Sequence, residues 1–167
     1  DAGAWYVYHA IYTISDKIRD RVRMLHDHGI LVEGTILLGL DEHDEDFLKR
    51  FIDFLLTIEL DVAEFTVLTP FPHTEVAWRL EAEGRILSRD WSLYDAGHVV
   101  FQPRLLSPDA LQRLYEEAWR AFHAEQSQAL RMSKLLLPVL REERARRRSS
   151  GDPPTTREGN PDGSVAR

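Results

Sequence analysis

Two apolar stretches decide the fold: ILVEGTILLGL, residues 30–40, and VAEFTVLT, residues 62–69. Each is a nearly continuous run of aliphatic and β-branched residues of strand length. Such runs are typical of strands that are buried on both faces of a parallel sheet. Between them, Asp44 opens a segment in which phenylalanine, leucine and isoleucine recur at helical spacing.

The sequence on either side repeats this alternation of strand and helix. Residues 5–11 (WYVYHAI) are aromatic and β-branched, which predicts a strand. A helix is expected from an N-cap at Ser15 to a terminating glycine at Gly29. After residue 69 two prolines end the second run, and a short helix is expected to stop at Gly84. This order indicates βαβ units and a parallel sheet.

The remainder of the chain differs in character. Residues 90–102 form an aromatic loop with a short extended piece, and Ser107-Pro108 is a strong helix start. The segment 141–167 has almost no apolar residue, so disorder is expected there. The sequence therefore divides into βα units (1–88), a mostly helical extension (89–140) and this tail.

Composition excludes several classes of function. The chain has 167 residues, no cysteine and a net charge of −7, and the tail carries seven arginines against five carboxylates. So acidic a body disfavours a nucleic-acid partner. Disulfides and thiolate metal sites are excluded, and no apolar run approaches the ~20 residues of a membrane span. A cytoplasmic location is expected.

Candidate binding residues follow the strands, because ligands of parallel α/β proteins bind at the carboxyl ends of strands. The first strand, residues 30–40, ends in Gly39-Leu40-Asp41. Gly39 would let a ligand approach the backbone closely, and Asp41 adds a carboxylate. The second end is a rigid turn with two prolines. Its candidate residues are Thr69, Pro70, Phe71 and His73.

Two glutamates lie inside the apolar runs, where an unpaired charge is costly. Alternation places Glu33 and Thr35 on one side of the first strand, and Glu64 on one side of the second. These carboxylates either line a ligand cavity or form structural ion pairs, and the sequence leaves both open. Among the histidines, His43 is expected to be solvated in an acidic turn, whereas His73 either takes part in the site or packs its loop. The spacing of the histidines indicates no metal site.

Residues 26–86 and the segments around 90–95 and 99–103 resemble the radical S-adenosylmethionine (SAM) superfamily, in particular its cobalamin (B12)-binding members. In that group one strand ends in a glycine turn, matched here by Gly39-Leu40-Asp41. A later strand ends Thr-Pro-x-Pro-Gly-Thr, matched by Thr69 to Thr74 with His73 at the usual glycine. The Cys-x3-Cys-x2-Cys motif of the group is absent.

The resemblance implies half of a TIM-type barrel with a helical C-terminal extension, and a chain that is the carboxy-terminal part of a longer iron–sulfur enzyme. That enzyme would use SAM, a [4Fe–4S] cluster and cobalamin for methyl transfer or another radical reaction on a small molecule. Its partners would be the missing half of the barrel and a cobalamin domain. Gly39 and Thr69 would enclose SAM, with Glu33 and Thr35 reaching its ribose or adenine. Catalytic residues are not assigned, and the fragment alone is expected to be inactive.

Two alternatives remain at this point. The three parallel strands would leave exposed edges, so the chain could be a half-barrel binding or assembly module that needs a partner chain. It could also be a self-sufficient α/β enzyme that uses Glu33, Glu64 and His73.

Overall fold

A computed structural model describes residues 4–124 as an α/β fold. Three parallel strands form its sheet in the order β1-β2-β3: β1 (Tyr6–Ile11), β2 (Leu31–Leu38) and β3 (Val62–Val67). The predicted parallel α/β class is therefore confirmed. The sheet is open, however, and closure into part of a TIM barrel is not seen in the described residues.

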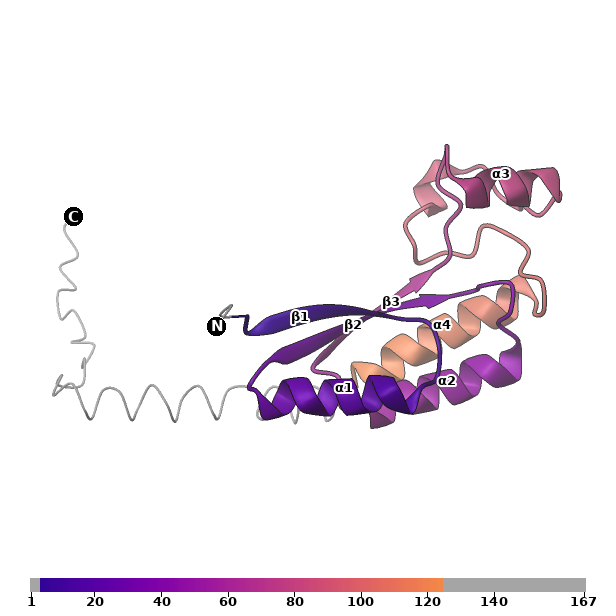
Figure 1. The fold of residues 1–167 in the computed structure, drawn as a ribbon. Coiled ribbons are helices and arrows are strands. Elements are labelled where there is room, and N and C mark those ends of the chain that lie inside the picture. Colours follow the sequence, from indigo (N-terminus) through magenta and orange to yellow (C-terminus); the bar gives the residue numbers. More distant parts are fainter. Residues whose placement is uncertain (1–3, 125–167) are drawn as a thin grey trace, which may run out of the picture. The chain divides into compact units, whose positions relative to one another are not determined.

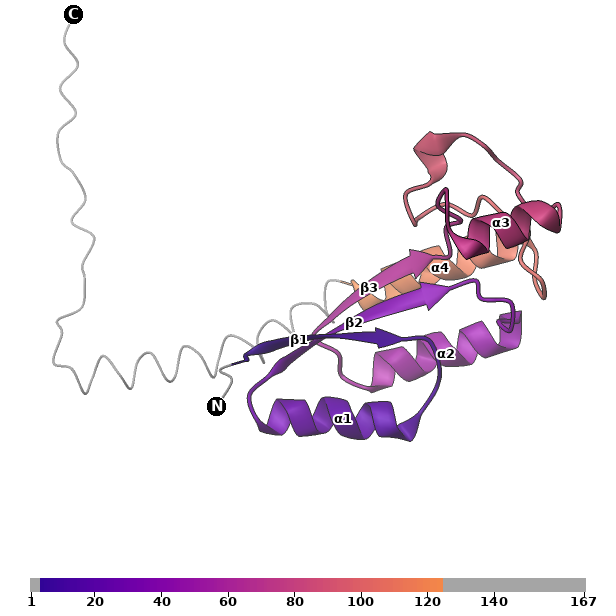
Figure 2. The same ribbon diagram turned by 45° about the horizontal axis from the view of Figure 1, so that its top comes forward.

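Helices cover one face of this sheet. α1 (Asp16–Asp27) joins β1 to β2, and α2 (Glu45–Thr57) joins β2 to β3. Figures 1 and 2 show both helices, together with α4 (Pro108–Phe122), on the same side of the strands. Aliphatic and phenylalanine side chains of the sheet and these helices form one continuous core.

Burial along the strands alternates, which corrects the prediction that both faces are covered. In β2, Val32, Ile36 and Leu38 are fully buried against the helices, whereas Glu33 and Thr35 are only half-buried. Within residues 4–124 no helix packs on that second side. We call it the open face, and its members are Tyr6, Tyr8, Leu31, Glu33, Thr35, Leu37, Val62, Glu64 and Thr66.

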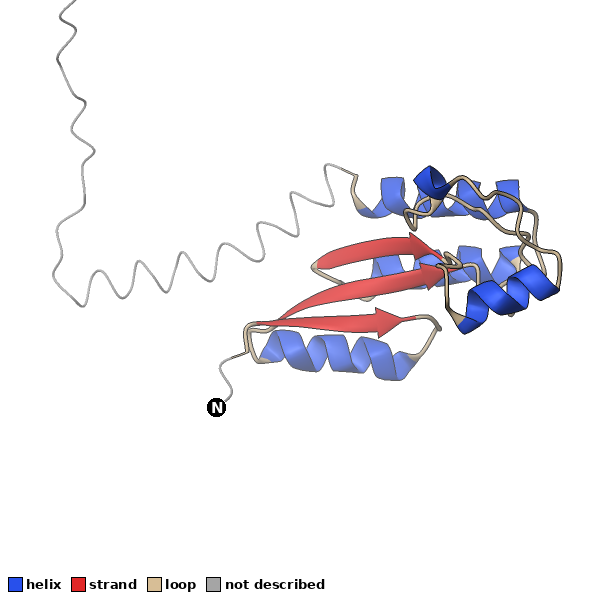
Figure 3. Ribbon diagram, turned by 90° about the horizontal axis from the view of Figure 1, so that it is seen from above, coloured by secondary structure: helices blue, strands red, loops and turns tan. Residues whose placement is uncertain are grey.

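The chain beyond β3 builds a cap at the carboxyl ends of the strands. α3 (Glu75–Ala82) lies beyond the strand tips in Figure 3, followed by the single 3-10 turn η1 (Trp91–Leu93). An antiparallel bridge between Ile86 and Phe101 closes the intervening loop. α4 then returns along the sheet, and a non-helical segment over residues 94–107 separates it from η1.

Helix starts follow the capping residues of the sequence. Asp44 accepts a hydrogen bond from the Phe47 amide at 2.7 Å, and Ser107 accepts one from Ala110 at 3.1 Å. Ser15 occupies the N-cap of α1 but makes no side-chain cap bond. Gly29 follows α1 with φ +70°, as expected for a C′ glycine.

The second helical stretch near 130–139 and the disordered tail lie outside the described residues. A search of the described part of the chain finds no helix with the length and apolar character that crossing a membrane would require.

Candidate functional site

The carboxyl ends of β2 and β3 lie side by side. Their register pairs Leu38 with Val67, and the Leu68 amide donates to the Leu38 carbonyl at 2.8 Å. The two turns that carry the predicted site residues therefore leave the sheet from neighbouring strands. The structure brings together what the sequence places about 30 residues apart.

The open face carries polar groups along the strands that lead to these turns. Tyr6 donates a hydrogen bond from its hydroxyl to Oε2 of Glu33, and Glu64 is the strand partner of Thr35. The other oxygen of Glu33 accepts no hydrogen bond within residues 4–124. Glu33 thus has a structural partner on one oxygen and acceptor capacity on the other, while Glu64 is exposed.

Tyr6 stays protonated beside this carboxylate. Desolvation by burial, the hydrogen bond to Glu33 and the negative charge of Glu33 all raise the pKa of the Tyr6 hydroxyl. A protonated phenol can only donate to Glu33, which fixes the orientation of the carboxylate. The pair is therefore a positioned acceptor on the open face.

Gly39 has a left-handed backbone, with φ +91°. A Cβ built there would lie 2.8 Å from Cδ2 of Leu111 and 3.3 Å from the Phe101 ring. Glycine is required because both the backbone conformation and the close approach of α4 exclude a side chain. A ligand-contact role for Gly39 stays a prediction.

Asp41 lies in the same turn and holds the cap to the sheet. Its carboxylate pairs with Arg85 at 2.8 Å and also with Arg79 of α3. Partial burial pushes the pKa of Asp41 upward, but the hydrogen bonds from Arg85 and Arg79 outweigh this effect and hold it below its usual value. Both carboxylate oxygens are engaged, so the geometry favours a structural role for Asp41.

The second turn carries the strained residue His73. Its φ is +65°, in the left-handed region that glycine adopts most easily. The turn therefore has the conformation that suits glycine, although histidine occupies this position. Thr69 bonds back to the Val67 carbonyl at 3.0 Å, and Phe71 is 48% exposed. The structure thus places Thr69, Pro70, Phe71 and His73 in the turn that follows β3.

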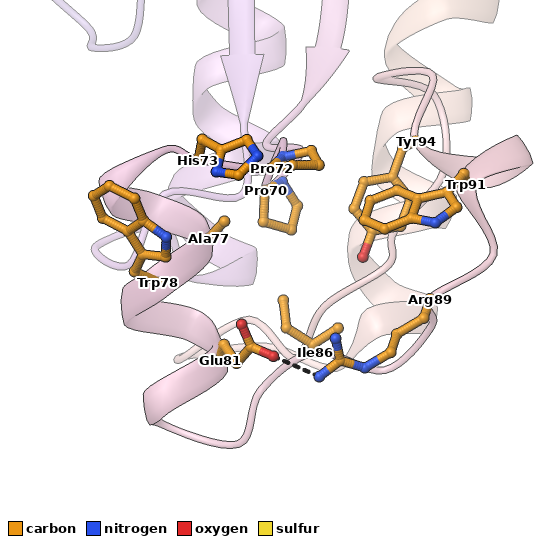
Figure 4. A pocket seen from close by; sticks show the side chains of 10 residues that line it. All are labelled: Pro70, Pro72, His73, Ala77, Trp78, Glu81, Ile86, Arg89, Trp91 and Tyr94. Atoms are coloured by element: carbon orange, nitrogen blue, oxygen red, sulfur yellow. Dashed lines mark hydrogen bonds and ion pairs between the residues drawn. The ribbon is translucent and has the colours of Figure 1, made fainter.

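A pocket of about 210 Å³ opens between this turn, α3 and η1. Figure 4 shows Trp78 on one side and Trp91 with Tyr94 on the other, below Pro70, Pro72 and His73. We call it the aromatic pocket. No sequence pattern indicated its two tryptophans as site residues, because they lie 13 residues apart on different elements and carry no local signal beyond their aromatic character.

His43 is buried, which corrects the prediction of a solvated residue. It is only 1% exposed, and its ring stacks on Phe47 with centroids 4.9 Å apart. Neither ring nitrogen has a hydrogen-bond partner within residues 4–124. The prediction relied on the acidic neighbours of His43 in the sequence. In the fold, Phe47 and Phe51 of α2 form an apolar wall beside the turn and bury the ring.

Burial makes the free energy of unfolding depend on the charge of His43. Desolvation lowers its pKa below 6.5, against the opposing negative charges of Glu42 and Asp44. The Tyr12 backbone also opposes the shift, although neither ring nitrogen meets it with hydrogen-bond geometry. A depressed histidine pKa favours the neutral form in the folded state. Its contribution is therefore complete above pH 6.5 and is lost as pH falls below that value.

Replacing the unpartnered imidazole should remove this dependence. We expect His43→Leu to be more stable than the unchanged chain by roughly 1 kcal/mol at pH 7, because an unsatisfied buried polar group disappears. Urea denaturation between pH 7 and 5 measures both effects, with His28→Gln as an exposed-histidine control. An unaltered pH slope in His43→Leu would contradict this account.

The chain is similar in sequence to two proteins that are named as methyltransferases. The chain is 32% identical over 90 residues to bacteriochlorophyllide d C-12(1)-methyltransferase of Chlorobaculum tepidum, which covers 54% of this chain and 19% of that protein. It is 22% identical over 104 residues to an uncharacterized methyltransferase of Pyrococcus horikoshii, covering 62% of this chain and 23% of that protein. The chain thus spans about a fifth of the length of these curated relatives. No family model matches it.

These findings correct the identification as a cobalamin-binding radical SAM enzyme. Both relatives are described as methyltransferases, and neither description carries iron–sulfur or cobalamin chemistry. The chain has no cysteine to ligate a [4Fe–4S] cluster, and residues 4–124 contain no group of three potential metal ligands. Of the expected activities, methyl transfer is the one that the relatives support. No finding favours the assembly-module alternative.

Proposed function

We propose that this chain forms part of a methyltransferase and contributes to the binding of its methyl donor, SAM. The observation that carries the proposal is the placement of Glu33 and Thr35 on the open face of β2, the strand whose carboxyl end adjoins that of β3. The names of the two relatives support the reaction class. Ligands of α/β proteins usually bind at the carboxyl ends of the strands, and Glu33 and Thr35 lie five and three residues before the end of β2.

The residues present suit the donor chemically. The free oxygen of Glu33 can accept hydrogen bonds from ribose hydroxyls, and the Thr35 hydroxyl can donate or accept. Carboxylates are also favourable neighbours for a positively charged sulfonium. Thr69, Pro70 and Phe71 would border the donor from the second turn, where Phe71 offers an exposed ring. SAM supplies the electrophilic methyl group, and these residues orient it and exclude water.

The open face also supports a finer proposal about architecture. All connecting helices lie on the other side of the sheet, and the open face mixes polar groups with half-buried aliphatic ones. In a barrel of βα units that side would face the interior, where ligands bind. The strands described here would then be three consecutive strands of such a barrel, with further strands beside β1 or β3.

Titration of SAM into the 167-residue chain by calorimetry tests the donor site. We expect Glu33→Gln to weaken binding about tenfold and Thr35→Val by a smaller factor, since hydrogen bonds to charged groups contribute more than neutral ones. Asp53→Asn is a charge-matched control on the exposed side of α2. Equal affinities for Glu33→Gln and the unchanged chain, with circular dichroism showing both folded, would contradict the proposal.

A further inference from the structure

The aromatic pocket shares Pro70 with the border of the proposed donor site, but its other walls have their own chemistry. Its walls are Trp78 of α3 and Trp91 and Tyr94 around η1, with Ile86 between them (Figure 4). Trp78 is 59% exposed and Trp91 is 62% exposed. Large aromatic rings left open around a concave surface mark a binding site more often than scattered single residues do.

The wall around η1 is held in place before any ligand arrives. Tyr94 donates its hydroxyl to the Ser88 carbonyl at 2.8 Å and packs on Trp91 with ring centroids 4.7 Å apart. Asp90 caps η1 by accepting from the Ser92 amide at 3.0 Å. Thr74 caps α3 in the same way. A pocket with fixed walls loses little conformational entropy on binding.

Recognition in this pocket rests on flat apolar surfaces. Its two charged side chains, Arg89 and Glu81, pair with each other at 2.6 Å and leave no unpaired charge for a ligand. Prolines line the opposite side, and the left-handed His73 lies at the same edge. Strain of this kind in a residue other than glycine is often retained at functional sites.

We propose that the aromatic pocket binds one edge of a planar conjugated ring system, the methyl acceptor of the reaction. The acceptor role rests on the proposed function, whereas binding of the ring rests on the pocket itself. The volume of about 210 Å³ admits part of a large macrocycle and leaves the rest outside. Stacking between Trp78 and Trp91 selects flat rings over flexible chains.

Protoporphyrin IX is the probe, and its absorbance band and emission anisotropy report binding without relying on tryptophan fluorescence. We expect Trp78→Leu and Trp91→Leu each to weaken binding about tenfold, as the loss of an aromatic stacking partner does elsewhere. Trp5→Leu is the matched control, because Trp5 is 69% exposed and lies outside the pocket. Dodecanoate, a flexible apolar acid, should not compete.

The outcomes separate this inference from the proposed function. Weakening in both pocket variants but not in Trp5→Leu, with porphyrin retained in excess SAM, supports the acceptor pocket. Equal binding by all variants, equal weakening in Trp5→Leu, or competition by dodecanoate overturns it. Displacement of the porphyrin by SAM also overturns it, since the pocket would then hold the donor. SAM binding itself is measured independently through Glu33→Gln.

Discussion

Gly39→Ala should lower the free energy of unfolding by roughly 3 kcal/mol, the largest effect among the substitutions that we propose. Two costs combine at this position. The new methyl group would lie 2.8 Å from Leu111. The backbone would also remain at φ +91°, a conformation that is strained for a residue with a β-carbon. Leu111 is fully buried, so it has little room to move away.

Gly29→Ala provides the matched control. Gly29 also has a positive φ, +70°, but a Cβ there meets nothing within 4 Å. Its substitution should therefore cost only the conformational part, about 1 kcal/mol. Urea denaturation of both variants measures the difference. Equal losses in the two variants would show that α4 does not pack against the end of β2 as described.

Asp41→Asn should destabilise the chain by roughly 2 kcal/mol, because it leaves Arg85 and Arg79 without their common carboxylate. The side chain of Arg85 is 12% exposed, so solvent compensates its charge only in part. Glu83 and the Gln102 carbonyl still accept from it, which keeps the loss below that of an isolated buried pair.

The pH dependence of Asp41 follows from the direction of its pKa shift. The carboxylate has a lowered pKa in the folded state, so its contribution is complete above the ordinary value of 3.8 and is lost as pH falls below it. Asp41→Asn should flatten that acid loss. Asp16→Asn, at an ion pair whose carboxylate is 85% exposed, should change little. A small effect of Asp41→Asn at pH 7 would contradict its role as the anchor of the cap.

The sequence predicts the order of elements because the signals are local. Each signal depends on neighbours within a few residues. Examples are the apolar runs at 30–40 and 62–69, the N-cap of α4 at Ser107, and Gly29, which follows the end of α1. Parallel pairing follows from the helical connections, and the structure confirms it.

What the sequence could not provide depends on contacts between distant segments. The neighbour of Gly39 is Leu111, more than 70 residues away, so packing could not be told from ligand approach. The burial of His43 arises from the wall of α2, and the aromatic pocket joins rings from two elements. Glu33 and Thr35 mark the open face, but Leu31 and Leu37 on the same side made the run resemble a strand that is buried on both faces.

The central claim is that SAM binds where the open face meets the adjoining ends of β2 and β3. Nuclear magnetic resonance of the nitrogen-15-labelled chain, with SAM added in steps, tests it most directly. The account predicts amide shifts concentrated in residues 33–39 and 66–71, with α1 and the outer side of α2 unchanged. Shifts confined to those helices, or no shifts at millimolar SAM, would contradict it.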